Sequence, residues 1–303
     1  MKALVTGATG FVGPRLLRLL DRPTVVSRNP ERARTAVGHL ADRIIRWDPR
    51  EGPPPAEAFD GVDAVLHLAG ESVAEGRWTA AQKNRIRDSR VIGTRHLVQG
   101  IAQAARKPAV LVSASAVGYY GNRGDEELTE AAGPADDFLA QVCVDWEREA
   151  AAAAKAGVRV VTARTGIVLG AGGGALAKML TPFKLGGGGP LGNGRQWMPW
   201  VHVADLARLY VHAVDTPAIS GPMNAVAPHP VRNLEFTKAL GRALHRPAFI
   251  PAPYFGLRLL FGEFAQVLFA SQRVIPQVAL DTGFTFQFPE IAGALREILG
   301  TAA

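Results

Sequence analysis

Cysteine is almost absent from this sequence, and its scarcity excludes several classes of protein. Of 303 residues only Cys143 is a cysteine, which leaves no internal disulfide and no cysteine-based metal site. No run of about 18 apolar residues exists, so no membrane span is predicted. The chain begins with the buried-strand pattern Ala3-Leu4-Val5 and lacks the features of a signal peptide. We therefore expect a cytoplasmic protein without a metal site or a membrane partner.

Acidic residues are also in deficit. The chain has 27 Asp and Glu against 34 Lys and Arg, a formal net charge of +7. Such an excess can indicate nucleic-acid binding. Here, however, the basic residues are spread along the chain, without a Lys/Arg block or an interleaved aromatic platform. We predict no nucleic-acid partner, and a basic surface that attracts anionic small molecules.

The first two-thirds of the chain alternates short apolar runs with helix-like segments, which is typical of a parallel sheet covered on both faces. We predict an α/β fold, a Rossmann-type doubly wound parallel sheet with a smaller mixed C-terminal lobe. The predicted strands are Lys2–Thr6, Thr24–Ser27, Ile44–Trp47, Ala64–Leu68, Ala109–Ser113 and Arg159–Arg164. The predicted helices between them are Pro14–Leu20, Ala80–Ala105 and Phe138–Ala156.

The composition changes after Gly170. Glycine runs at 172–174 and 186–189 bracket a short apolar helix, and a stretch rich in Trp and Pro follows at 195–200. We assign residues 1–170 to an NADP-binding Rossmann domain, to which 201–226 returns, and residues 171–200 and 227–303 to a smaller substrate lobe. The two are expected to meet over the carboxyl ends of the strands, where ligands bind in such folds.

A glycine-rich turn follows the first predicted strand and opens the first predicted helix. In the spacing Gly7-x-x-Gly10-x-x-Gly13, the first glycine permits a tight turn and the second lets backbone approach a pyrophosphate. The third lets helix and strand pack closely, and the helix N-terminus faces the anion. The turn, including Thr9, Phe11 and Val12, therefore predicts a dinucleotide site.

The end of the second predicted strand distinguishes the two nicotinamide dinucleotides. An acidic residue there hydrogen-bonds the ribose 2′-hydroxyl of NAD, whereas arginine accommodates the 2′-phosphate of NADP. This chain has Ser27-Arg28 at that place and no acid before Glu31. We predict NADP(H) as the cofactor; the alternative is a solvent-facing arginine at a strand end.

The chain resembles the extended short-chain dehydrogenase/reductase superfamily, and within it an atypical subfamily labelled "epimerase family". The motifs that carry the resemblance are Thr6–Gly13, Ser27-Arg28, Trp47-Asp48, His67–Ser72, Gly76-Arg77-Trp78, Arg87–Arg90, Ser113–Gly121, Asp137-Phe138-Leu139, Cys143, Trp146-Glu147, Arg164–Gly170 and Gly194–Asp205. They cover nearly the whole chain.

The resemblance implies further cofactor contacts. Leu68, Ala69 and Gly70 would lie along the ribose and phosphates, although strand–helix packing also suits such residues. Arg164 would border the nicotinamide end. Arg90 stands where extended relatives usually have Asn, and would either reach a phosphate bidentately or form a surface salt bridge.

The catalytic pattern of the superfamily is broken. Its enzymes use a Tyr-x-x-x-Lys pair, in which lysine lowers the tyrosine pKa. Alignment on Glu147 puts Leu139 and Cys143 at those two positions, while the substrate-orienting serine is retained as Ser115. We assign the catalytic role to Ser115 and Tyr120, with Tyr119 as the other candidate for the missing acid. The alternatives are an NADP(H) sensor without turnover and a scaffold that keeps the cofactor for stability.

The second lobe contributes candidate substrate contacts. Trp197, Trp200 and His202 lie in a stretch that borders the substrate in extended relatives; core packing between the domains is the alternative. Asp205 is expected to cap the helix that begins there. The substrate is expected to be a small molecule such as a nucleotide-sugar or a carbonyl compound. Relatives commonly dimerise through a four-helix contact, which here would use 80–105 and 138–156.

Overall fold

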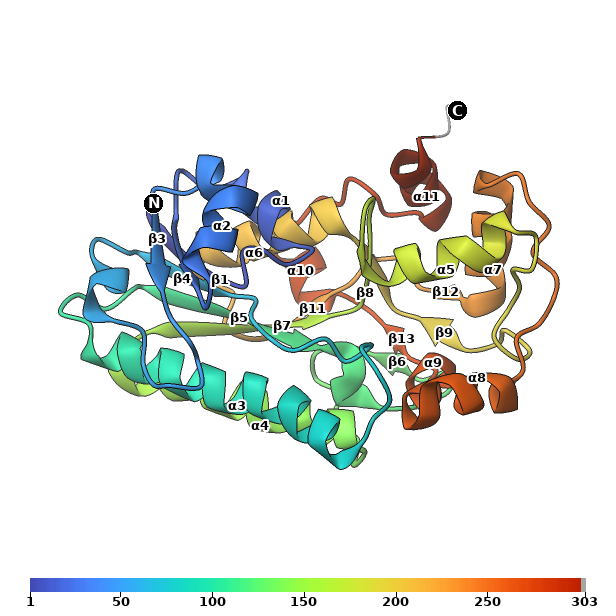
Figure 1. The fold of residues 1–303 in the computed structure, drawn as a ribbon, viewed down its shortest axis with the longest axis horizontal. Helices are drawn as coiled ribbons and strands as arrows, with labels where there is room; N and C mark the ends of the chain where they lie inside the picture. The colour runs from blue at the N-terminus through green and yellow to red at the C-terminus, as the bar shows by residue number, and fades with distance from the viewer. Residues whose placement is uncertain (301–303) are drawn as a thin grey trace.

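A computed structural model describes residues 1–300, and its centre is a seven-stranded parallel sheet (Figure 1). The sheet order is β11-β7-β5-β4-β1-β2-β3. The strands are β1 Ala3–Thr6, β2 Thr24–Ser27, β3 Arg43–Arg46, β4 Ala64–His67, β5 Val110–Ala116, β7 Arg159–Thr165 and β11 Gly221–Ala225. The order reverses direction between β1 and β4, which is the place where open α/β sheets leave a ligand-binding crevice.

Helices cover both faces of this sheet, as Figure 1 shows. The helices are α1 Gly13–Leu17, α2 Pro30–Val37, α3 Ala80–Gln103, α4 Phe138–Ala151, α5 Gly174–Lys184, α6 Val203–Asp215, α7 Asn233–Ala243, α8 Tyr254–Phe261, α9 Ala265–Phe269, α10 Gln277–Asp281 and α11 Ile291–Leu299. Leu16 of α1 and Leu209 of α6 pack with Val112 on one face. Leu97 of α3 and Ala150 of α4 pack with Leu111 on the other. The predicted Rossmann-type α/β fold is confirmed.

The second lobe lies beyond the carboxyl ends of the strands and has a core of its own. Its small sheets pair β8 Ile167–Leu169 with β10 Trp200–His202, β9 Trp197–Met198 with β12 Val231–Arg232, and β6 Glu127–Leu128 with β13 Arg273–Val274. Leu176 of α5, Phe236 of α7 and Leu295 of α11 share one apolar cluster. Ala279 and Phe284, by contrast, pack in the cluster of the large sheet, although both lie within the range assigned to the substrate lobe.

Two elements of the sheet region were not predicted. Helix α2 buries only Ala33 and Val37, so its apolar pattern is short; its local signals are Pro30 at the first turn and the Asn29 side chain, which accepts from the Arg32 N–H. Strand β11 contains Pro222 and lies at the edge of the sheet, where a proline does not break a ladder on its open side.

Strand β5 runs three residues beyond its predicted end, so Ser115 is part of the strand. Among residues 1–300, no helix combines the length and the apolar character that crossing a bilayer requires.

Gly13 allows helix α1 to begin against the turn that precedes it. A Cβ atom at this position would lie 2.0 Å from the backbone oxygen of Ala8. We therefore expect Gly13→Ala to lower the free energy of unfolding by about 2 kcal/mol or more. Urea denaturation measures this change.

Gly293→Ala is the matched control, because no atom lies within 4 Å of the added Cβ in α11. That substitution should raise stability by about 0.5–1 kcal/mol, as expected for Gly to Ala within a helix. Equal stability of the two variants would contradict the packing role of Gly13.

Candidate functional site

The glycine-rich turn lies against the carboxyl end of the neighbouring strand. Gly7 has a φ of +69°, and a Cβ there would come within 2.8 Å of the backbone nitrogen of Ala69. The turn closes through a 2.9 Å hydrogen bond from the Gly10 N–H to the Gly7 oxygen. Only a residue without a side chain at position 7 lets the turn after β1 come so close to Leu68 and Ala69, which follow β4. The exposed backbone that results is a suitable cradle for a pyrophosphate.

A pocket of about 380 Å³ opens at this place, between β1 and β4. It is lined by 6–10, 25–28 and 68–71, together with Trp47, Pro49, Arg50, Arg85, Asp88 and Ser89. The structure thus brings together eight residues predicted to bind the cofactor: Gly7, Thr9, Gly10, Ser27, Arg28, Leu68, Ala69 and Gly70. Their roles stay predictions, but their convergence fits an extended dinucleotide lying across the switch point.

Two arginines of this pocket were missed from the sequence. Arg50 is held by Asp48, with Nε 3.0 Å from Oδ1 and Nη2 2.6 Å from Oδ2. The hydrogen bonds from Arg50 lower the pKa of Asp48 to about 2. The second, Arg85, donates through Nε to Gln82, 3.0 Å away. Arg28 is exposed and forms no ion pair within residues 1–300. Three arginines thus line the pocket together with two acidic residues, Glu71 and Asp88.

Phe11 and Val12 do not line this pocket. The ring of Phe11 packs against Gly170, Gly173 and Gly174, where added Cβ atoms would lie 2.6 to 3.0 Å from ring carbons. Val12 is the residue on which α1 begins. Phe11 therefore connects the turn with the start of the second lobe, and part of the glycine run at 172–174 is needed to accept its ring.

His67, at the end of β4, hydrogen-bonds to residues of both β1 and α3 beneath the pocket. Its Nδ1 lies 2.7 Å from Oγ1 of Thr6, and its Nε2 lies 2.9 Å from Oγ1 of Thr94 on α3. Burial lowers the pKa of His67 to about 4, so the ring is neutral near pH 7. Its contacts indicate a structural role.

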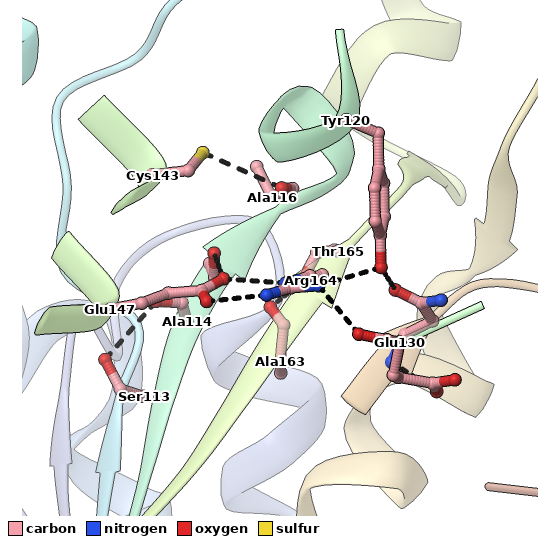
Figure 2. A network of polar contacts seen from close by, with 12 residues as sticks. Ser113, Ala114, Ala116, Tyr120, Glu130, Cys143, Glu147, Ala163, Arg164 and Thr165 are labelled. Carbon is pink, nitrogen blue, oxygen red and sulfur yellow. Dashed lines mark hydrogen bonds and ion pairs between the residues drawn. The ribbon is translucent and has the colours of Figure 1, made fainter. Parts of the chain in front are cut away.

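A buried polar network occupies the carboxyl ends of β5 and β7 (Figure 2). Arg164 of β7 donates through Nε and Nη2 to the two carboxylate oxygens of Glu147 on α4, each at 2.9 Å. Its Nη1 donates to the Tyr120 hydroxyl at 3.0 Å and to the Glu130 backbone oxygen at 3.4 Å. Burial alone would lower the pKa of Arg164, but Glu147 raises it above its usual value. Four of its five N–H groups are used, which leaves one for a ligand.

The catalytic candidates lie around this network. Ser115 donates its hydroxyl proton to Oε1 of Glu147 over 2.6 Å. Tyr120 is fully buried, and its hydroxyl donates to Oδ1 of Asn224 over 2.7 Å. Tyr119 is half-buried beneath the Arg164 guanidinium, 3.5 Å from the ring centroid, and its hydroxyl has no hydrogen-bond partner in the described part of the chain. The catalytic role of Tyr120 stays a prediction, and the geometry gives Tyr119 the more available hydroxyl.

Leu139 and Cys143, which the sequence predicts at the positions of the superfamily's Tyr and Lys, face the same strand end. The side chain of Leu139 lies against Gly118, and the thiol of Cys143 lies 3.7 Å from the Ala116 oxygen. Burial raises the pKa of Cys143 to about 12, and the charge of Glu147 adds to this effect. Neither side chain can exchange a proton near pH 7.

The predicted substrate residues make separate contacts in the second lobe. Trp200 is 1% exposed in the lobe core, with Nε1 donating to the His229 oxygen, which favours the packing alternative. Trp197 is half-buried and donates to Asp125 over 2.7 Å. His202 is buried between Phe288 and Glu297, and its Nδ1 accepts from the Ala204 N–H. These contacts do not converge on one cavity.

Asp205 was predicted to cap α6, and this is wrong. His202 is the residue that caps the helix, and Asp205 lies in its first turn. The carboxylate of Asp205 instead accepts the backbone N–H groups of Gln287 and Phe288, at 2.9 and 2.8 Å. It fastens the returning C-terminal segment to the sheet domain, a contact between residues about 80 positions apart.

Comparison with known proteins places the chain in a family. Residues 3–225 match the NAD dependent epimerase/dehydratase family, and residues 252–298 match a domain of unknown function, DUF1731. The chain belongs to the NAD dependent epimerase/dehydratase family. The predicted resemblance is confirmed.

Relatives from distant organisms match over almost their whole length. Epimerase family protein Mb2239 of Mycobacterium bovis is 40% identical, over 96% of this chain and 95% of its own. The human epimerase family protein SDR39U1 is 38% identical, over 99% of this chain and 100% of its own.

Solved structures give the same result at the level of the fold. The crystal structure of human SDR39U1 (isoform 2) with NADPH superposes with a TM-score of 0.87 at 36% identity, over 100% of both chains. A UDP-glucuronic acid 4-epimerase from Bacillus cereus has a TM-score of 0.79 at 16% identity, over 99% of this chain and 98% of its own. The second likeness shows the shared fold.

Glu147 and Glu149 lie on one helix and each binds an arginine with both oxygens, but only the first pair is buried. The side chains of Arg164 and Glu147 are 4% and 14% exposed, whereas Arg95, the partner of Glu149, is 49% exposed. We expect Glu147→Gln to destabilise the protein by about 3–5 kcal/mol, because it leaves a buried guanidinium without a counter-charge.

Glu149→Gln is the control and should cost at most about 1 kcal/mol, because its ion pair is partly screened by water. Urea unfolding of both variants gives the comparison. Equal losses would show that the Glu147 pair is no more than a surface contact.

Proposed function

We propose that this protein binds NADP(H) and uses it in an oxidation–reduction step on a small molecule that carries a hydroxyl or carbonyl group, such as a nucleotide-sugar. The observation that carries the cofactor assignment is the pocket at the switch point. It combines the glycine cradle with Arg28, Arg50 and Arg85, and it has no acidic residue at the end of β2. The crystal structure of human SDR39U1 with NADPH supports the same cofactor.

Each part of this pocket suits one part of NADP(H). The turn 7–10 and the start of α1 present backbone N–H groups to the pyrophosphate. Arg28, which forms no ion pair within 4.0 Å in residues 1–300, is available to bind the 2′-phosphate, and Ser27 adds a hydroxyl without negative charge. Bound NADP(H) would supply or accept a hydride at its nicotinamide ring. The remaining task of the chain is to orient the substrate and to hold or move a proton.

The residues available for that proton differ from the usual pair of the superfamily. Ser115 stands at the end of β5, with its proton directed to Glu147. Tyr119 follows in the next turn and has its ring against the positive charge of Arg164. We infer that Ser115 and Tyr119 are the residues nearest to the chemistry and that Tyr120 supports them.

A non-catalytic NADP(H) sensor is the second candidate function. The observation that favours it is the chemistry of Leu139 and Cys143, which cannot replace Tyr and Lys. Such a protein would bind NADP and NADPH with different affinities and change shape without turnover.

The cofactor proposal can be tested through charge reversal at one arginine. We expect Arg28→Glu to weaken NADP binding by about tenfold or more and to leave NAD binding nearly unchanged, because only NADP has the 2′-phosphate. Isothermal titration calorimetry measures both affinities.

Arg32→Glu makes the same change of charge on α2 outside the pocket and should alter neither affinity. The assignment fails if wild-type protein binds NAD as tightly as NADP, or if Arg28→Glu leaves NADP affinity intact.

Turnover separates the enzyme from the sensor. An enzyme should consume NADPH with a member of a panel of nucleotide-sugars, quinones and small carbonyl compounds. We expect Ser115→Ala and Tyr119→Phe each to lower kcat by about 10²-fold or more, and Tyr120→Phe to lower it less. Absence of turnover across the panel, with different affinities for NADP and NADPH, would support the sensor instead. A reaction that survives the combined variant Ser115→Ala/Tyr119→Phe/Tyr120→Phe would refute the assignment of these residues to the catalytic site.

A further inference from the structure

Arg90 connects the cofactor pocket with helix α4. Its Cζ lies 3.4 Å from the position that a Cβ of Gly70 would take, so the guanidinium packs directly against the end of β4. The same guanidinium lies over the ring of Trp146, 5.1 Å from its centroid. Trp146 follows Cys143 by three residues on α4, so both lie on neighbouring turns of one helix face. Arg90 thus stands between the wall of the pocket and the position where the superfamily has its lysine.

Arg90 has no ion pair, although it is only partly exposed. Of the other arginines of α3, Arg87 is paired with Asp145 and Arg95 with Glu149. Arg85, which is exposed, is held by the neutral amide of Gln82. Arg90 has no carboxylate oxygen within 4.0 Å among residues 1–300, and its one hydrogen bond goes from Nη1 to the Ile86 oxygen. Burial lowers its pKa. An unpaired, partly buried cation with free N–H groups is costly unless a ligand completes it.

The direction of the crevice indicates which part of the ligand lies beside Arg90. The 2′-phosphate end is placed at Arg28 beyond β2, and the pyrophosphate at the turn after β1. A dinucleotide that continues across the switch point therefore brings its nicotinamide half to the ends of β4 and β5. Gly70 and Glu71 line this part of the pocket. The oxygens available there are the hydroxyls of the second ribose, which are good acceptors for a guanidinium.

We propose that Arg90 supplies from α3 the fixed positive charge that the superfamily places on α4, and that it donates hydrogen bonds to the ribose hydroxyls on the nicotinamide half of NADP(H). This inference rests on the proposed function and assigns a positioning residue within it. It replaces the phosphate contact expected from the sequence. Because α4 has Cys143 at the lysine position, the charge comes from the helix that faces it.

Fragments of the cofactor distinguish the ribose from the phosphates. We would titrate NADPH, 2′-phospho-ADP-ribose, and 2′-phospho-ADP, which keeps the diphosphate but lacks the second ribose. Arg90→Met retains a stem able to pack on Trp146. We expect it to weaken the first two ligands by about ten- to hundredfold and to leave the third unchanged. Arg87→Met, on the same helix but paired at the surface, is the control and should change none of the three.

Equal weakening of all three ligands would assign Arg90 to the phosphates and overturn the proposal, as would unchanged affinities. If wild-type protein binds none of the three, the proposed function fails instead, so the two failures are distinguishable.

Stability of the ligand-free protein tests whether the role is merely structural. Removal of an unpaired buried charge should leave the Tm of ligand-free Arg90→Met unchanged or higher, while the rise in Tm on adding NADPH becomes smaller. A lower ligand-free Tm with an undiminished NADPH shift would overturn the proposal. The double variant Arg90→Met/Cys143→Lys places a cation on α4 and should bind NADPH more tightly than Arg90→Met alone. A folded double variant without recovery would show that the two positions do not exchange the charge.

Discussion

The close approach of the first turn to the end of β4 is the contact on which the site depends. Gly7 comes so near to Leu68 and Ala69 that a Cβ atom would overlap their backbone. Because the chain leaves β1 toward α1 on one face of the sheet and leaves β4 toward α3 on the other, this contact forms the floor of the crevice. His67 and the Thr6 hydroxyl hold the same place from within, with Thr6 Oγ1 also accepting the Ala69 N–H at 3.2 Å. The shape of the pocket is therefore set by the backbone, and charged side chains only add to its chemistry.

Charge divides this crevice into two parts. Beside the ends of β2 and β3, Arg28 is exposed without an ion pair in residues 1–300, whereas Arg50 is held by Asp48. At the ends of β5 and β7 the charges are already balanced, because Glu147 pairs with Arg164 through two hydrogen bonds and also accepts one from the Ser115 hydroxyl. A satisfied buried network of this kind is rigid and costly to disturb. Leu139 and Cys143, the residues predicted to stand at the positions of the proton-shuttling pair, lie beside this network.

Much of the fold could be predicted from the sequence, because the signals were local. Six strands of the large sheet show as short apolar runs, and the glycine spacing places the turn between β1 and α1. Strand β11 was not predicted, since its Gly221-Pro222 start resembles a loop and its pairing with β7 joins residues 60 positions apart in the register Gly221↔Val161. Arg50 was missed for a related reason. Arg50 belongs to the pocket only because β3 pairs with β2. No local sequence pattern near Arg50 indicates that pairing.

The sequence by itself determined the properties that depend on neighbouring residues. These are the glycine turn, the Ser27-Arg28 pair at a strand end, and the absence of Tyr and Lys from α4. The tertiary structure decided which polar groups are paired and which remain free, because pairing needs partners brought together by the sheet. It placed Tyr120 in the core and left the Tyr119 hydroxyl available, although the two are adjacent. It buried Trp200, paired Glu147 with Arg164, and left Arg90 without an ion pair in residues 1–300. Steric limits act within a few residues, whereas burial and charge balance are set by the packing of the whole chain.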